Sequence, residues 1–274
     1  MSSERGGGAR RLAAADLREM KRRGDRIAAI TAYDYLFARL VDAAGVDVVL
    51  VGDSLGQVVL GLDSTLAVTL DDMIHHARAV RRGVARALLV VDLPFLTYQV
   101  TREDALRNAG RVMQETGAAA VKLEGGSPET CDTVRALVRA GIPVMGHLGF
   151  TPQSVNQIGV RVQARENGAA ERLVEDARRL EEAGAFSVVL ELVPGTVAQA
   201  ATDALQIPTI GIGAGVGCDG QVLVLHDMLG LNADFRPKFL RRFAEVGQAA
   251  SEGIVGYVQA VKGGEYPAAE HTFE

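Results

Sequence analysis

Short aliphatic runs recur along the whole chain with helical patterns between them, and this alternation most restricts the fold. The runs lie at residues 27–33, 47–52, 87–92, 119–124, 143–147, 186–191, 207–212 and 222–226. They are apolar throughout rather than alternating, which is typical of parallel strands covered on both faces. Helical patterns occupy most of the intervals, for example 70–83, 102–117, 127–141 and 171–184. Each of these four ends in glycine, which suits a left-handed helix end, and Thr69 or Asp71 and Ser127 are the expected N-caps.

Eight such strands joined by helices predict an α/β protein with a (β/α)8 barrel, the TIM barrel. A doubly wound open sheet is the main alternative. The length of 274 residues suits one such barrel, and no linker-like segment interrupts it, so we expect a single domain over 1–274. Residues 12–24 predict an N-terminal helix over one end of that domain, and 235–262 predict a long helix packed outside. Residues 1–10 and 263–274 are expected to be flexible tails.

Charge and cysteine content argue against several classes of protein. The formal net charge of −5 argues against a nucleic-acid surface, which needs a clustered excess of Lys and Arg. The sequence has no apolar run of the roughly 18 residues that a membrane helix needs, so we expect no membrane partner. Two cysteines, Cys131 and Cys218, do not make a disulfide scaffold, and the polar N-terminus does not resemble a signal peptide. These features predict a soluble, cytoplasmic protein.

Four of the apolar runs end in an acidic residue. These residues are Asp53, Asp92, Glu124 and Glu191. In a parallel barrel the C-terminal strand ends form the mouth of the active site, so the four acids are expected to converge there. Asp53 could instead cap a following helix, and Glu191 could be a solvated acid at the rim. Convergence of all four would be costly without a cation.

The residue types at these strand ends favour a hard divalent cation. Carboxylates with no thiolate nearby suit Mg²⁺, which takes only one or two of them together with waters and substrate oxygens. At least one acid is therefore available as a general base. Lys122 lies two residues before Glu124 and projects to the same face, where it could bind a substrate oxygen or pair with Glu124. A cation beside a base is suited to enolate chemistry on a small oxo acid.

Two other signals are weaker. His147 ends the fifth strand and is expected at the mouth, either in contact with substrate or in a hydrogen bond to another site residue. The segment GVGCDG at 215–220 matches the dinucleotide pattern formally, but it precedes another strand-like run instead of a helix. A tight loop close to a ligand is the better interpretation.

The ordered set of motifs resembles the ketopantoate hydroxymethyltransferase family from about Ala28 to Phe235. The motifs are TAYDY, VGDSLG, DLPF, VKLEGG, GHLGFTPQS, VLELVP and GIGAG followed by DGQVLV. The resemblance implies a barrel similar to those of phosphoenolpyruvate/pyruvate enzymes. It also implies hydroxymethyl transfer from 5,10-methylenetetrahydrofolate to 3-methyl-2-oxobutanoate, which gives 2-dehydropantoate for pantothenate biosynthesis.

Carried over residue by residue, the resemblance also assigns roles. It implies that Asp53 and Asp92 bind Mg²⁺ and that Glu124 completes the metal site, directly or through water. Asp53, Ser54, Asp92 and Lys122 would contact the oxo acid, and Glu191 would be the proton acceptor. The family is homo-oligomeric, typically decameric, so the same is expected here.

Two other functions are weighed against this one. A carbon–carbon lyase of the related enolate enzymes would usually carry a catalytic cysteine in a flexible loop, and we find no such motif in the sequence. A barrel kept only as an assembly protein would be favoured by loss of Lys122 or one of the acids, and none is missing.

Overall fold

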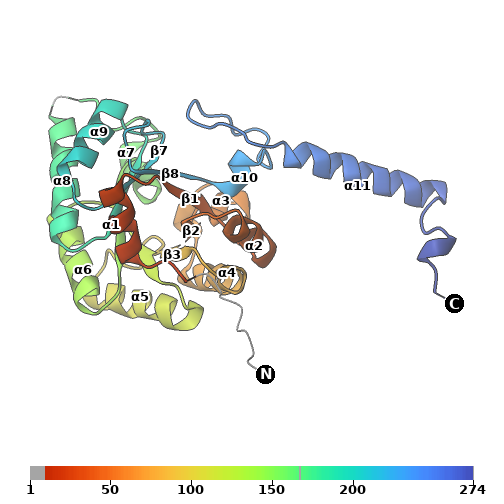
Figure 1. Ribbon diagram of the computed structural model, residues 1–274, viewed down its shortest axis with the longest axis horizontal. Helices are drawn as coiled ribbons and strands as arrows, with labels where there is room; N and C mark the ends of the chain where they lie inside the picture. Colours follow the sequence, from red (N-terminus) through yellow and green to blue (C-terminus); the bar gives the residue numbers. More distant parts are fainter. Residues whose placement is uncertain (1–9, 167, 274) are drawn as a thin grey trace, which may run out of the picture. The chain divides into compact units, whose positions relative to one another are not determined.

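The computed structural model describes residues 10–166 and 168–273 and divides them into two compact units (Figure 1). The first unit extends to Val224 and the second begins at Leu225. The predicted tail at residues 1–10 lies, apart from Arg10, outside the described residues. The single-domain organisation over the whole chain stays a prediction.

The first unit contains a closed barrel of eight parallel strands that follow one another in chain order. Closure confirms the predicted (β/α)8 architecture and excludes the open sheet. The strands are β1 (Ile27–Thr31), β2 (Val48–Val51), β3 (Leu88–Asp92), β4 (Ala120–Lys122), β5 (Val144–Gly149), β6 (Ser187–Glu191), β7 (Thr209–Ile212) and β8 (Gly220–Leu223).

Helices cover the outside of this barrel and pack on their neighbours in chain order (Figure 1). The helices of the first unit are α1 (Ala14–Arg23), α2 (Tyr35–Ala43), α3 (Leu55–Val58), α4 (Leu70–Gly83), α5 (Arg102–Thr116), α6 (Pro128–Arg139), α7 (Val155–Ile158), α8 (Ala169–Glu182) and α9 (Gly195–Ala204), with 3-10 turns η1 (Thr65–Ala67) and η2 (Pro152–Ser154). Thr69 and Ser127 are confirmed as N-caps, because their hydroxyls accept hydrogen bonds from backbone N–H groups of the first turn.

The glycines at the predicted helix ends do not all play the same part. Gly117 has a φ of 71° and ends α5 in the left-handed conformation, as predicted. The prediction is wrong for Gly83, which is the last helical residue of α4 and has no left-handed φ. A Cβ at Gly83 would lie 2.7 Å from the Tyr35 carbonyl oxygen and 2.8 Å from Ala38 Cβ. Its glycine therefore allows α4 to approach α2 closely.

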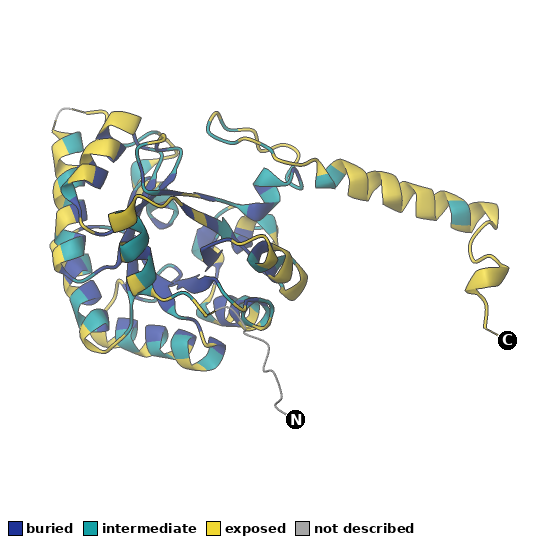
Figure 2. Ribbon diagram, in the orientation of Figure 1, coloured by how far each residue is buried: buried dark blue, intermediate teal, exposed yellow. Residues whose placement is uncertain are grey.

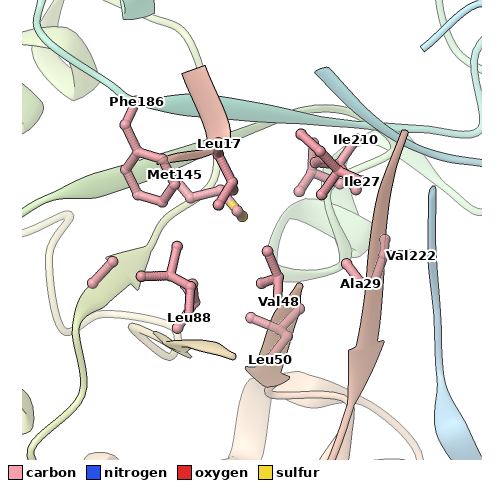
Figure 3. Packing of buried hydrophobic residues seen from close by; sticks show 13 residues of the cluster. Leu17, Ile27, Ala29, Val48, Leu50, Leu88, Met145, Phe186, Ile210 and Val222 are labelled. Carbon is pink, nitrogen blue, oxygen red and sulfur yellow. The ribbon is translucent and has the colours of Figure 1, made fainter. Parts of the chain in front are cut away.

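The barrel interior is filled by aliphatic side chains from most of the strands (Figure 3). Leu17 from the N-terminal helix α1 is fully buried in this cluster together with Met145 and Phe186. Residues 12–24 were predicted to form a helix over one end of the barrel, and Leu17 gives that helix its anchor. Burying a leucine of this kind contributes on the order of 2 kcal/mol through the hydrophobic effect.

The last predicted strand and the last predicted helix of the chain begin at other residues in the structure than the sequence indicated. Strand β8 begins at Gly220 instead of residue 222, since Gly220 already pairs with Ile27 of β1. A Cβ at Gly220 would collide with the Ile27 carbonyl oxygen, so only glycine fits there. The second unit holds α10 (Leu225–Met228), α11 (Val246–Gly263) and the 3-10 turn η3 (Ala269–His271). The predicted helix over 235–262 thus begins only at Val246, after a segment that contains Pro237. None of the residues of α11 is buried within the chain (Figure 2).

Among the described residues, no helix is both long and apolar enough to cross a membrane.

Candidate active site

The four acids predicted to converge all lie at the C-terminal ends of barrel strands. Asp92 and Glu191 are the last residues of β3 and β6, and Asp53 and Glu124 follow β2 and β4 by two residues. Because all eight strands are parallel, these ends open on the same side of the barrel. Asp53, Asp92 and Glu124 are buried, whereas the Glu191 side chain keeps 18 % of its surface exposed. The strand ends therefore deliver the acids to one mouth.

Lys122 pairs with Asp92 across two neighbouring strands. The two residues are register partners in β3 and β4, and Lys122 Nζ lies 2.7 Å from Asp92 Oδ1 with both side chains buried. The sequence had left two partners open for Lys122, a substrate oxygen or Glu124, which shares its face of the strand. Burial works against the charge on Lys122, but Asp92 and then Glu124 and Asp53 outweigh it and raise its pKa. Lys122 therefore carries its positive charge within the site.

Asp53 is held by the loops around it and does not act as a helix cap. Its Oδ2 accepts a hydrogen bond of 2.8 Å from Gln153 Nε2, and its backbone N–H donates to Asp92 Oδ2 at 3.0 Å. Burial, and then the charges of Asp92 and Glu124, raise the pKa of Asp53 to about 8. The neighbouring Ser54 hydroxyl contacts the Tyr33 hydroxyl at 2.8 Å. A further positive charge nearby would therefore stabilise the ionised form of Asp53.

The strand turn that carries Asp53 leaves little room beside Gly52. A Cβ at Gly52 would lie 2.8 Å from Ser54 Oγ and in ordinary contact with Asp92 Oδ2 at 3.5 Å. A side chain there would displace the Ser54 hydroxyl. The VGDSLG motif therefore combines a glycine that leaves room with the polar residues that use it.

His147 connects two of the acids. Its Nδ1 lies 3.3 Å from Glu124 Oε1 and its Nε2 lies 3.2 Å from Glu191 Oε2, so it bridges the ends of β4 and β6, the two neighbours of its own strand β5. Burial and the Lys122 charge act to lower the pKa of His147, but the contacts with Glu124 and Glu191 outweigh them and raise it to about 9. Burial acts to raise the pKa of Glu124, but the contact with His147 and the charge of Lys122 outweigh it and lower that pKa. Of the two roles left open for His147, the contacts favour interaction with site residues.

Two polar residues of the site were not identified from the sequence. Gln153 in η2 and Tyr98 in the loop after β3 are both buried and hydrogen bond to each other at 2.8 Å. Tyr98 Oη accepts from the Glu124 backbone N–H at 3.0 Å, and burial together with the Glu124 charge raises the pKa of Tyr98 well above its usual value. Gln153 stands within the GHLGFTPQS motif, a signal that could have found it; Tyr98 carries none.

The donor groups in the mouth suit a hard divalent cation. Asp92 Oδ1 and Glu124 Oε1 are buried and lack a partner in hydrogen-bond geometry, although each has a cationic neighbour. Within the described residues, no three His, Cys, Asp or Glu side chains form a ready-made metal-binding group. Mg²⁺ takes one or two carboxylates and completes its shell with water and substrate oxygens, so Asp53 and Asp92 fit it chemically. The assignment of Asp53, Asp92 and Glu124 to a metal stays a prediction.

The arrangement combines acceptors, cations and a partly open base. Lys122 supplies positive charge next to Asp92, and a protonated His147 supplies it next to Glu124. Glu191 differs from the other three acids because part of its side chain is exposed. A site of this kind can bind a small anionic molecule and remove a proton from it.

Comparison with known proteins assigns this chain to one family over nearly its whole length. A family model described as ketopantoate hydroxymethyltransferase matches residues 11–269. A 3-methyl-2-oxobutanoate hydroxymethyltransferase of Chloroflexus aurantiacus is 56 % identical over 262 residues, which cover 96 % of this chain and 92 % of that protein. Proteins of the same name from Nitratidesulfovibrio vulgaris and Syntrophus aciditrophicus are 56 % and 54 % identical, over 98 % and 96 % of this chain and 87 % and 97 % of their own lengths.

Solved structures support the fold. The barrel is similar to 2,3-dimethylmalate lyase, a member of the PEP mutase/isocitrate lyase superfamily, with a TM-score of 0.59, 18 % identity and coverage of 95 % of this chain and 91 % of that one. It is also similar to phosphonopyruvate hydrolase in complex with oxalate and Mg²⁺, with a TM-score of 0.61, 12 % identity and coverage of 95 % and 93 %. At such identities the likeness concerns the fold alone.

Proposed function

The chain belongs to the ketopantoate hydroxymethyltransferase family, and from this premise we propose how its residues carry out the reaction. The protein is a transferase that adds a hydroxymethyl group to 3-methyl-2-oxobutanoate and gives 2-dehydropantoate, a step of pantothenate biosynthesis. The observation that carries the assignment of roles is the convergence of Asp53, Asp92, Glu124 and Glu191 around Lys122 and His147 at one barrel mouth.

Asp53 and Asp92 hold Mg²⁺ in this proposal, and Glu124 completes the metal site. When bound, the cation supplies Lewis acidity toward the carboxylate and carbonyl oxygens of the oxo acid. The buried Asp92 and Glu124 oxygens that lack a partner in hydrogen-bond geometry, and the raised pKa of Asp53, support this assignment. Lys122 offsets negative charge that three buried acids and an anionic substrate would otherwise accumulate. Ser54, Asp53, Asp92 and Lys122 contact the oxo acid.

Glu191 is the proton acceptor. It takes the proton from C3 of the oxo acid, and the electron pair of that C–H bond is delocalised into the carbonyl as an enolate. C3 then forms the new carbon–carbon bond with the methylene carbon of 5,10-methylenetetrahydrofolate. The two C–N bonds of that carbon break, tetrahydrofolate leaves with its nitrogens protonated, and one water molecule supplies the hydroxyl group of the product. One contact and one exposure support this role. His147 Nε2 lies 3.2 Å from Glu191 Oε2 and orients the carboxylate, and the exposed part of the Glu191 side chain is open to a substrate.

We also propose that the protein is a homo-oligomer, a decamer as the family resemblance implies. Leu36 and Leu40 of α2, four residues apart on one face, are 68 % and 65 % exposed. On α11, Ile254, Tyr257 and Val261 follow a helical spacing and remain largely exposed. Apolar helix faces of this kind support burial against further copies of the chain.

The proposed location is the cytoplasm. Cys131 and Cys218 are both free and buried in the structure, which is compatible with a compartment that keeps thiols reduced.

The role of Glu191 is tested with Glu191→Gln, which keeps the shape of the side chain and removes its basicity. We expect loss of C3 deuterium exchange of 3-methyl-2-oxobutanoate in D₂O, while Mg²⁺-dependent binding of the oxo acid persists. Glu182→Gln, an exposed acid at the end of α8, is the matched control and should exchange normally. Normal exchange in Glu191→Gln would remove Glu191 from the base role. Calorimetry that shows no Mg²⁺-dependent binding by the wild-type protein would reject the proposed site altogether.

A further inference from the structure

Gln153 is a buried amide that contacts the ends of three barrel strands. Its side chain Nε2 donates to Asp53 Oδ2 after β2 at 2.8 Å and to the Leu93 carbonyl after β3 at 3.0 Å. Only 5 % of the residue is exposed, so water does not compete for these bonds. Both amide protons are therefore committed to fixed acceptors in the mouth.

The orientation of this amide is determined by the donors that meet its oxygen. Gln153 Oε1 accepts from the Tyr98 hydroxyl at 2.8 Å and from Gln99 Nε2 at 3.0 Å. A flipped amide would turn its NH₂ group toward the Gln99 amide donor and its oxygen toward the Asp53 carboxylate. The network thus admits one orientation, in which the donor faces Asp53.

The backbone of the same residue holds a second acid. The Gln153 N–H donates to Glu124 Oε2 at 3.0 Å, while His147 lies against the other oxygen of that carboxylate. Pro152, at the first position of the turn η2, presets the backbone that aims this N–H group. One residue therefore orients two of the three carboxylates assigned to the cation, from two different strands.

We propose that Gln153 is a positioning residue that fixes the carboxylates of Asp53 and Glu124 in the arrangement that a divalent cation and the oxo acid require. This inference rests on the proposed function. Removal of a group that hydrogen bonds to a metal ligand typically weakens metal affinity by about 10- to 100-fold. The side-chain half of the network acts on Asp53 and can be removed by substitution, whereas the backbone bond to Glu124 remains. A partial loss of affinity is therefore expected.

The test measures Mn²⁺ binding to the full-length protein by electron paramagnetic resonance, without substrate. Gln153→Met preserves the volume and length of the side chain and removes its donors, and Gln153→Glu replaces the NH₂ group with an oxygen that repels Asp53. We expect each variant to bind Mn²⁺ about 10- to 100-fold more weakly. Gln57→Met is the matched control, because this glutamine of α3 is exposed and its side chain donates to the Asp63 carbonyl, so the variant should bind Mn²⁺ as the wild type does. KM for the oxo acid, measured at saturating Mg²⁺, should rise in both Gln153 variants.

A merely structural role makes a different prediction. It would lower the melting temperature of Gln153→Met but leave Mn²⁺ affinity within twofold of the wild type well below that temperature, and this result would overturn the inference. If neither Gln153 variant folds, Tyr98→Phe removes the donor that orients Oε1 and should weaken Mn²⁺ binding several-fold; unchanged affinity would overturn the inference. Wild-type protein that turns over but binds Mn²⁺ no better than Gln153→Met overturns this inference alone. Wild-type protein that neither binds Mn²⁺ nor turns over overturns the proposed function with it.

Discussion

Removal of the Lys122 charge is the most decisive perturbation of this site. Lys122→Met keeps an unbranched side chain in β4 and deletes the ammonium that lies 2.7 Å from Asp92 Oδ1. Both side chains are buried, at 6 % and 3 % exposure, so solvent screens the pair little. Among the described residues that act on these acids, the substitution leaves Asp53, Asp92 and Glu124 with His147 as the remaining cation.

The expected size of the effect follows from this geometry. Two unit charges 2.7 Å apart attract by about 6 kcal/mol at an effective dielectric constant of 20. The cost of burying the ammonium offsets part of this, and breaking a buried pair typically costs about 3–5 kcal/mol of stability. For a folded unit of this size each kcal/mol corresponds to about 2–4 °C in melting temperature. Lys122→Met should therefore melt about 6–20 °C below the wild type.

Differential scanning calorimetry of the metal-free protein checks this value, with Lys238→Met as an exposed lysine control that should change stability by less than about 0.5 kcal/mol. Asp92→Asn completes a double-mutant cycle. Because the loss comes from an unpaired buried charge, the double variant should melt closer to the wild type than Lys122→Met does. Melting of Lys122→Met within about 1 °C of the wild type, or losses that simply add in the double variant, would refute the reasoning.

Other predictions test separate parts of the molecule. Folding raises the pKa of Asp53 to about 8, so the Asp53 carboxyl loses its proton at lower pH in the unfolded chain than in the folded protein. The free energy of unfolding of the metal-free protein should therefore fall as pH rises from about 4 to 8. Mg²⁺ binding at pH 7 should correspondingly release about one proton, seen as calorimetric heats that depend on the buffer, and a buffer-independent heat would contradict this. Leu17→Ala should cost about 2–5 kcal/mol in urea denaturation, because the leucine is fully buried in the barrel cluster. Gly83→Ala should destabilise by about 1–3 kcal/mol through its contacts with α2. Gly110→Ala in the open middle of α5 should stabilise by roughly 0.5–1 kcal/mol; equal effects at the two glycines would contradict the packing argument.

The strand positions and the acids at their ends could be predicted from the sequence, because each depends on residues close together in the chain. A run such as residues 87–92 shows both that a strand is buried on two faces and that Asp92 ends it. The closed barrel places every such end on one side, so convergence of the four acids required only the fold class. The sequence predicted the N-terminal helix over one end of the barrel, but it did not predict that Leu17 of this helix is buried in the barrel interior.

Partners that depend on register could not be predicted in the same way. The spacing of Lys122 and Glu124 within one strand predicted that they share a face, and this left Glu124 and a substrate oxygen as the two candidate partners of Lys122. The pairing that forms is with Asp92, because β3 and β4 align these two residues directly and the alignment is set by both strands together. Local spacing describes one strand, whereas an ion pair across a barrel depends on two.

Gln153 illustrates the same limit more strongly and shows why the site is more than its charged residues. Its contacts join segments 100 and 29 residues away in the chain, so no local pattern in the sequence reports them. Carboxylates that must converge repel one another, and burial increases that repulsion. Charged partners alone would neutralise the acids that a cation needs, whereas a neutral amide orients a carboxylate and leaves its charge available. A neutral donor in contact with the acids is therefore what the proposed chemistry would need, and residue types chosen for their charge alone do not reveal it.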